Sequence, residues 1–342
     1  MPGWLCGALN LLASPNLPNR EGERLCLALE AMGPTFIKLG QALSTRADLM
    51  SEAVAEDLAR LRDRLPPFSA QHMRKTVEAD LEAPLDTLFA KFEEEPVAAA
   101  SIAQVHLATT PDGEKVAVKV LRPGIRSAFT RDIALFYWIA EQLELRFPPL
   151  RRLKPVAVVE TFEDSIHKEL DLRMEAAAAE TLRNNTLEDN GLYIPAIDWN
   201  RTAERVLTME RIEGIPISDV EAIKEAGHDV NQLLKIAADS LFQQVFRDGF
   251  FHADLHPGNL FVLPDGRLAA VDFGITGRID KRNRIFIAEI LRSFLQGDYR
   301  QVAEVHIAAG YVPSHHHVDD FALACMAIGK PVLGKPLQDI SI

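Results

Sequence analysis

Apolar residues recur every three or four positions over residues 21–64, with charged residues between them, which is the period of amphipathic helices. Pro66 and Pro67 end this pattern. A further helix is predicted over residues 69–81, with Ser69 at its N-cap, and a polar, acidic stretch continues to Glu95. Residues 1–95 therefore predict a helical N-terminal extension.

From Pro96 the pattern changes to short apolar runs that are typical of strands. Residues 97–107 and 116–121 flank a Pro111-Asp112-Gly113 turn, which predicts a β-hairpin. Helical periods follow over residues 129–147 and 154–185, and strand patterns over 193–197 and 205–212. Residues 96–213 thus predict a mixed domain.

Residues 214–342 are mostly helical in pattern and predict a second mixed domain. Its strands are expected at residues 259–262 and 268–271, on either side of a Pro264-Asp265-Gly266 turn.

The charge balance excludes some functions. There are 37 Lys and Arg residues against 49 Asp and Glu residues, a net charge of -12, which opposes binding to nucleic acid. The cysteines Cys6, Cys26 and Cys325 are far apart, as expected for a reducing cytoplasmic compartment. The longest apolar run, residues 321–328, is much shorter than the ~20 residues that span a bilayer, and residues 1–13 lack a signal-peptide pattern, so we expect this chain alone to be soluble.

The most informative motif is His252-Ala253-Asp254 followed by Asn259, because it places a carboxylate and an amide five residues apart before a strand. In phosphoryl transfer, Asp254 would orient the acceptor or take its proton, and Asn259 would bind Mg²⁺ through its amide oxygen. Two other interpretations stay open: a capping turn, or a metal site of His252, Asp254 and His256.

Two further motifs complete a kinase-like order. Val116-Ala117-Val118-Lys119 would direct Lys119 to the α- and β-phosphates, although a strand lysine more often faces solvent. Asp272-Phe273-Gly274 follows the second hairpin, where Asp272 would bind the bridging Mg²⁺. Together the three motifs resemble those of protein kinases.

Residues 207–214 resemble the strand and hinge that hold adenine, with Met209 as gatekeeper and the backbone of Glu210 and Ile212 as hydrogen-bonding groups; an ordinary edge strand is the alternative. Val105 and Ala117 would line the nucleotide. In place of a glycine-rich loop the chain has an alanine-rich one, whose methyl groups restrict close backbone approach to phosphate. That loop is Ala98, Ala99, Ala100 and Ser101. After Asp272 there is neither an Ala-Pro-Glu tripeptide nor a long activation segment, which argues against peptide substrates.

At residues 22–330 the chain resembles the UbiB family of atypical kinases, also called ADCK or ABC1 kinase-like proteins. The motifs that carry the resemblance are Lys38-Leu39-Gly40-Gln41, the alanine-rich loop and Glu169-Leu170-Asp171. The resemblance implies an α+β, protein-kinase-like bilobal fold with its N-terminal helical extension packed over the active site. The occluding residues would be Lys38, Gly40, Gln41, Glu169 and Asp171.

The resemblance also implies ATP or ADP with Mg²⁺ as cofactors and an ATPase or phosphotransferase activity in ubiquinone biosynthesis. The implied partners are lipid or quinone precursors and quinone-biosynthesis enzymes. The family's hydrophobic C-terminal segments are missing here, so we expect a truncated chain whose full-length form binds the cytoplasmic side of the bacterial inner membrane.

Either Glu175 or Glu169 is expected to pair with Lys119. We favour Glu175 for Lys119, with Glu169 and Asp171 for Lys38. Two alternative functions stay open: a nucleotide-switched assembly module with little catalysis, and a small-molecule phosphotransferase of the aminoglycoside or choline kinase type, against which the Lys38 motif argues. The tract His315-His316-His317 is expected to be a solvated loop and not a metal site.

Overall fold

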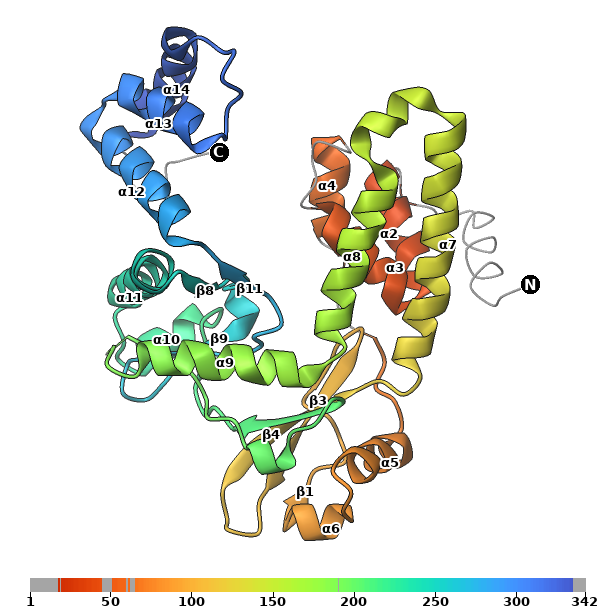
Figure 1. Ribbon diagram of the computed structural model, residues 1–342. Helices are drawn as coiled ribbons and strands as arrows, with labels where there is room; N and C mark the ends of the chain where they lie inside the picture. The colour runs from red at the N-terminus through yellow and green to blue at the C-terminus, as the bar shows by residue number, and fades with distance from the viewer. Residues whose placement is uncertain are drawn as a thin grey trace. The chain divides into compact units, whose positions relative to one another are not determined.

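The computed structural model describes residues 18, 20–44, 51–59, 61, 65–189 and 191–334. The expectations for residues 1–13 and Cys6 lie outside this range. The chain divides into two compact units, shown in Figure 1. The first comprises residues 1–181 and 194–213, and the second comprises residues 182–193 and 214–342.

An antiparallel sheet organises the first unit. Its strand order is β1-β3-β4-β6, with β2 also paired to β3. The strands are β1 (Lys91–Phe92), β2 (Ala98–Ala99), β3 (Ala103–Thr109), β4 (Lys115–Leu121) and β6 (Val206–Glu210). In β4 the side chains of Val116, Val118 and Val120 are buried in a core with Met73 and Val77, because alternate residues of a strand face the same side.

The helices of this unit pack against the sheet or pack together at one end of it (Figure 1). They are α2 (Glu21–Met32), α3 (Pro34–Ser44), α4 (Glu52–Ala59), α5 (Ala70–Asp80), α6 (Leu85–Leu88), α7 (Ile125–Arg146), α8 (Pro155–Glu169) and α9 (Leu172–Thr186), with 3-10 turns η1 (Pro148–Leu153) and η2 (Trp199–Arg201). The core shared by α2–α4, α7 and α8 includes Phe36, Phe136 and Phe162.

Three predicted elements are interrupted. The helical pattern of residues 21–64 is broken after α2, where Gly33 has a positive φ of 108° and Pro34 begins α3. The strand expected over residues 97–107 separates into β2 and β3. The helix expected over residues 154–185 separates into α8 and α9 at Leu170 and Asp171, where the backbone N–H of Leu172 donates to Glu204. As expected, Ser69 caps α5 by accepting the N–H of His72.

The second unit contains two small sheets. One has the order β5-β10-β9-β7, and the other pairs β8 with β11. The strands are β5 (Leu192–Tyr193), β7 (Ile215–Pro216), β8 (Phe250–His252), β9 (Leu260–Val262), β10 (Leu268–Ala270) and β11 (Thr276–Arg278). The hairpin of β9 and β10 is the one predicted from the sequence.

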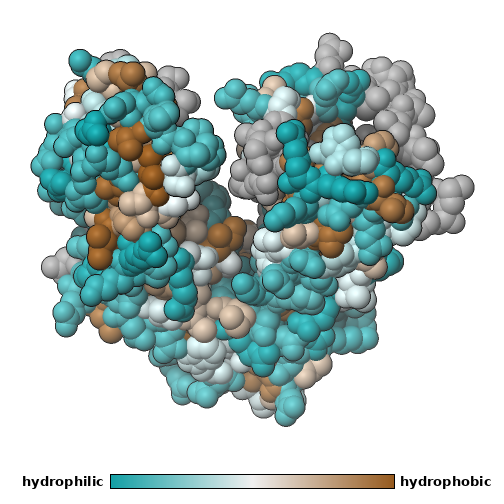
Figure 2. All heavy atoms as spheres, turned by 45° about the horizontal axis from the view of Figure 1, so that its top comes forward, coloured by the Kyte–Doolittle hydropathy of each residue, from teal (hydrophilic) through white to brown (hydrophobic). Residues whose placement is uncertain are grey.

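The helices of this unit are α10 (Val220–Glu225), α11 (Val230–Phe242), the π-helix η3 (Gln243–Asp248), the 3-10 turn η4 (Pro257–Asn259), α12 (Lys281–Gln296), α13 (Tyr299–Ala309) and α14 (Val318–Val332). Figure 2 shows a band of hydrophobic residues among hydrophilic ones over α12–α14, on its left side. Among the described residues, no helix has both the length and the apolar character that a membrane span requires.

Candidate functional site

An ion pair joins β4 to the first turn of α9. The ammonium of Lys119 lies 2.9 Å from both carboxylate oxygens of Glu175, and the two side chains are 15% and 6% exposed. Since the β-branched side chains of Val118 and Val120 are buried on the opposite face of the strand, they fix the backbone that carries Lys119. Glu175 therefore fixes a cation in a position where water competes little with it.

The predicted nucleotide-lining side chains of the sheet share one face. In the antiparallel register Lys119 is opposite Val105 and Ala117 is opposite Met209. Paired residues point to the same side, and Ala117 is two positions from Lys119, so all four belong to one surface. This surface combines one positive charge with small and apolar side chains.

The alanine-rich loop is fixed by an arginine that the sequence motifs did not include. Ala98 and Ala99 pair with Val105 and Gln104, and the chain then turns through Ala100 to the fully buried Ser101. The guanidinium of Arg122 donates to the carbonyl of Ala100 at 2.8 and 3.0 Å and to that of Leu65 at 3.2 Å. Arg122 directly follows β4, which was the only sequence signal available.

The end of β6 is held by backbone hydrogen bonds. Glu210 donates its N–H to the carbonyl of Ala196 at 2.8 Å, and its carboxylate accepts the N–H of Ala196. Arg211 donates to the carbonyl of Lys115. Ile212 lies two residues beyond the end of β6, outside the sheet. The segment predicted as a hinge is thus an ordered continuation of β6.

In the second unit, Asp254 and Asn259 contact each other. The amide nitrogen of Asn259 donates to the backbone carbonyl of Asp254 at 3.1 Å and to its carboxylate at 3.3 Å. This orientation leaves the amide oxygen of Asn259 available as a hard ligand for a divalent cation. The geometry suits the kinase-type interpretation of the motif, because Asn259 both orients Asp254 and offers a metal ligand.

Asp272 has a left-handed backbone, with φ of 65°. Residues with a Cβ rarely adopt this conformation, and Asp and Asn tolerate it best. The adjoining chain is tied to the Asp254 loop on both sides: Val271 donates to the carbonyl of Asn259 at 2.9 Å, and Ala253 donates to that of Ile275 at 3.0 Å. These hydrogen bonds hold the backbone next to Asp272 against that of Asn259. The side-chain oxygens of both residues are suitable ligands for Mg²⁺.

Buried groups support this loop from beneath. The ring of His252 packs edge-on against Phe273 at 5.4 Å, and its Nδ1 accepts the N–H of Asp254. Burial lowers the pKa of His252 below 6.5, so the imidazole is neutral at pH 7. The side-chain oxygen of Gln244 accepts the N–H of His252 at 2.9 Å. Gln244 lies in the π-helix, a local distortion that no motif in the sequence indicates.

The alternative metal sites are absent from the described residues, among which no three His, Cys, Asp or Glu side chains converge. His256 instead accepts the N–H of Gly258 at 2.9 Å and caps the η4 turn. The His315–His317 tract forms no such group either.

A second ion pair joins the extension to the sheet-bearing part of the first unit. The ammonium of Lys38 on α3 lies 2.9 Å from the carboxylate of Glu169 at the end of α8, with exposures of 15% and 14%. Gly40 lies so close to α2 that an added Cβ would come within 2.7 Å of Leu29. Asp171 accepts hydrogen bonds from Arg173 at 2.7 and 2.8 Å, a partner that the sequence did not suggest, and these bonds lower the pKa of Asp171. Gln41 is half-buried on α3.

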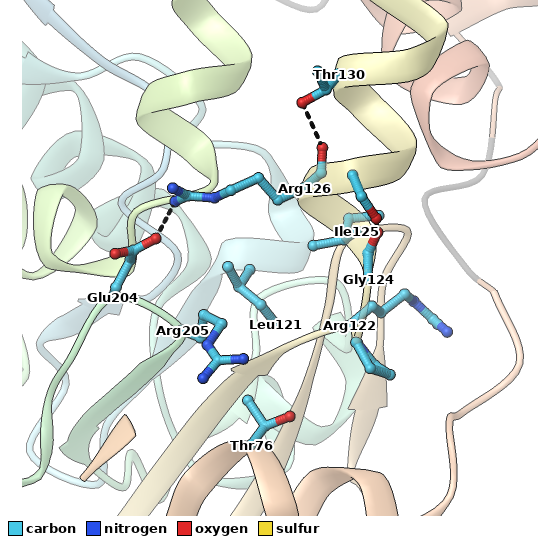
Figure 3. A pocket seen from close by; sticks show the side chains of 11 residues that line it. Thr76, Leu121, Arg122, Gly124, Ile125, Arg126, Thr130, Glu204 and Arg205 are labelled. Atoms are coloured by element: carbon cyan, nitrogen blue, oxygen red, sulfur yellow. Dashed lines mark hydrogen bonds and ion pairs between the residues drawn. The ribbon is translucent and has the colours of Figure 1, made fainter. Parts of the chain in front are cut away.

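A separate cavity of about 420 Å³ lies at the N-terminal end of α7 (Figure 3). Arg122, Arg126 and Arg205 line it. Arg126 pairs with Glu204, and Arg205 pairs with Asp80, so the charges of these two arginines are already neutralised. None of the predicted nucleotide or metal residues lines this cavity.

Comparison with known proteins identifies the family. Residues 60–306 match the sequence model of the ABC1 atypical kinase-like domain. The chain belongs to this family. It is 46% identical to a "Probable protein kinase UbiB" of Marinobacter nauticus over 342 residues, covering 99% of this chain and 62% of that protein. It is 43% identical to the protein of the same name from Azotobacter vinelandii, covering 100% of this chain and 65% of that protein.

The chain therefore spans less than two thirds of these relatives. Among solved structures it resembles that of Rv3197 of Mycobacterium tuberculosis in complex with erythromycin, with a TM-score of 0.66 and 25% identity over 86% of this chain and 74% of that one. The predicted kinase-like fold of mixed helices and strands, with helices at its N-terminal end, is confirmed, as is the resemblance to the UbiB family.

Proposed function

We propose that this protein binds Mg-ATP and acts as an atypical kinase or ATPase in ubiquinone biosynthesis. The observation that carries the proposal is the pairing of Lys119 with Glu175 at 2.9 Å, together with the contact of Asn259 with Asp254. Phosphoryl transfer depends on such fixed charges, because catalysis rests on positioning and on stabilising the charge of the phosphoryl group.

Each residue has a proposed role. Lys119 neutralises the α- and β-phosphates, and Glu175 holds it in place. Asp254 orients the attacking hydroxyl or water and accepts its proton, while Asn259 keeps the Asp254 carboxylate in orientation. Asn259 and Asp272 hold Mg²⁺, which supplies charge neutralisation at the phosphates when bound. Ala98–Ser101, Val105, Ala117 and Met209 enclose the nucleotide, and the backbone of Glu210 and Ile212 bonds its base.

The acceptor is proposed to be water or a small lipid-like molecule and not a protein. Only two residues separate Phe273 from β11, and α12 begins at Lys281. This stretch is too short for the folded activation segment on which kinases bind peptides. The alanine-rich loop and the Lys38–Glu169 pair are further departures from peptide kinases.

Two measurements test the proposal. Mg-ADP should raise the melting temperature of the chain, and Asp272→Asn should abolish the Mg²⁺-dependent part of this shift. Phosphate release from ATP should exceed that of Asp254→Asn, with phenolic quinone precursors and anionic vesicles added in turn to find the acceptor. An unchanged Mg-ADP shift in Asp272→Asn would contradict the metal assignment.

A nucleotide-switched assembly module is the second candidate. The Lys38–Glu169 pair favours it, because a contact between the extension and α8 is a suitable element for a nucleotide-dependent rearrangement. If Mg-ADP binds but phosphate release equals that of Asp254→Asn under all conditions, the module function holds and the enzymatic one does not.

A further inference from the structure

The loop between α7 and α8 concentrates positive charge in an acidic protein. Residues 145–159 contain four cations and no Asp or Glu, whereas the whole chain has a net charge of -12. The cations are Arg146, Arg151, Arg152 and Lys154. A cluster of one sign against the opposite background creates a local potential that attracts anionic partners.

Large apolar side chains lie exposed in the same place. Leu145 at the end of α7 is 67% exposed, and Phe147 directly after it is 54% exposed. Trp138, which is 59% exposed, precedes Leu145 by seven positions and so lies on the same face of α7 two turns earlier. Exposed aromatic and aliphatic groups that adjoin one another mark an interaction surface more often than isolated ones do.

The loop is well structured. Its η1 turn contains two prolines, and Leu150 donates its N–H to the carbonyl of Phe147 at 2.9 Å. Glu144, the nearest acid, is engaged internally: its carboxylate accepts the N–H of Val156, and its carbonyl accepts a hydrogen bond from Arg151. Within the part of the chain that the structure describes, Arg146, Arg152 and Lys154 form no ion pair. Their charges are thus available to a partner.

This loop is the end of a helical hairpin, the end away from the sheet of the first unit (Figure 1). An apolar apex flanked by cations on a projecting turn suits an anionic bilayer, where apolar groups enter the interface and cations contact phosphates.

We propose that the tip of the α7–α8 hairpin docks onto an anionic phospholipid surface. Phe147 and Leu145 enter the headgroup region, Arg146, Arg152 and Lys154 contact lipid phosphates, and Trp138 lies at the level of the headgroups. This inference goes beyond nucleotide binding and does not depend on it, because none of these residues belongs to the proposed nucleotide site.

Co-sedimentation of the whole chain with vesicles tests the proposal. The chain should bind mixed phosphatidylcholine and phosphatidylglycerol vesicles and not pure phosphatidylcholine. Joint replacement by Arg146→Gln, Arg152→Gln and Lys154→Gln should weaken binding on the order of a hundredfold, since each cation near an anionic surface contributes about fivefold. Phe147→Ser should weaken it about tenfold, because burial of an aromatic side chain is lost.

Matched controls change the same properties elsewhere. Lys224→Gln, Lys235→Gln and Lys330→Gln together remove three exposed charges, and Leu187→Ser removes an apolar side chain that is 62% exposed. Both controls should bind as the wild type does. All variants should keep the wild-type affinity for Mg-ADP, which separates this test from that of the proposed function. Arg152→Gln alone, expected to lose about fivefold, is the second variant should the triple one unfold.

Polyglutamate serves as a second, non-lipid anionic probe. Three results would overturn the proposal: the wild type does not bind anionic vesicles, the tip variants bind vesicles as well as their controls do, or the tip variants still bind vesicles but no longer bind polyglutamate. The last result would assign the tip to an acidic polypeptide.

Discussion

The ammonium of Lys119 is equidistant, at 2.9 Å, from the two carboxylate oxygens of Glu175. Lys38 is likewise 2.9 Å from Glu169. Two lysines and two glutamates of the first unit are thus sorted into separate pairs, each more than four fifths buried at both side chains. Removing one member of a buried ion pair is strongly destabilising, because the other charge stays buried. Substitutions in the two pairs should therefore have separate effects.

Glu175→Gln should reduce nucleotide affinity at least tenfold, because Lys119 loses the anion that orients it. Breaking a buried pair from one side costs about 3 kcal/mol of stability. Glu169→Gln is the matched control: it should lower stability through Lys38 while nucleotide affinity changes little. Equilibrium binding of a fluorescent nucleotide and urea unfolding of both variants measure this, and equal losses of affinity would refute the division of roles.

Asp272 allows a separation of backbone and metal roles. Asn tolerates the left-handed φ of 65°, so Asp272→Asn should fold with wild-type stability and lose only the Mg²⁺-dependent part of nucleotide binding. Asp272→Val should lose this binding too and also about 1–2 kcal/mol of stability, since a Cβ-branched residue opposes the left-handed conformation. Unfolding of the two variants without nucleotide gives the comparison, and equal stability would show that the backbone conformation imposes no such cost.

The sequence motifs contain the candidate catalytic residues but not the groups that hold them in place. Short motifs, whose spacing follows from the chemistry, contain Asp254, Asn259 and Asp272. The hairpin of β9 and β10 between them was predicted from its Pro-Asp-Gly turn. Arg122 was not predictable, because its partners are the backbone carbonyls of Ala100 and Leu65, which carry no residue signature.

Gln244 was missed for a related reason. It reaches the backbone of His252 from a π-helix, and the sequence of that segment reads as ordinary helix. The break at residues 100–102 between β2 and β3 was also missed, since a run of small residues has neither strand alternation nor a turn signal.

Arg122→Lys tests whether the alanine-rich loop needs its fixed position. An ammonium cannot reproduce the fork of donors with which the guanidinium binds two carbonyls, so the loop should loosen. We expect nucleotide affinity to fall about tenfold and stability by about 1–2 kcal/mol, the range for lost hydrogen bonds from a charged group. Arg126→Lys is the control, because Arg126 binds Leu170 and Glu204 and not the loop. An unaltered affinity in Arg122→Lys would mean that the loop is held by its strand pairing alone.

His106 makes stability sensitive to acid. It is fully buried on β3, where its Nδ1 contacts the carbonyl of Glu93 at 2.9 Å and its Nε2 contacts the side-chain nitrogen of Gln104 at 2.7 Å. A carbonyl requires a donor at Nδ1, so Nε2 must accept from Gln104, and the ring is neutral. The oxygen of Gln104 in turn accepts the N–H of Phe68, which anchors the chain before α5. Protonation of His106 would place an N–H at Nε2 opposite the N–H of the Gln104 side chain, so this hydrogen bond would be lost.

Burial lowers the pKa of His106 below its ordinary value of 6.5. The unfolded chain therefore binds more protons than the folded one at pH values between the folded pKa and 6.5, so stability should fall as the pH drops below about 6.5 and level off below the folded pKa. The share of one histidine cannot exceed about 1.4 kcal/mol per pH unit. Burial also lowers the pKa of His252, so this residue makes stability fall with decreasing pH in the same way. His106→Asn should flatten the profile of unfolding free energy between pH 7 and pH 5, measured by urea titration, since it removes one of the two contributions; a profile parallel to that of the wild type would mean that His106 does not titrate in this range.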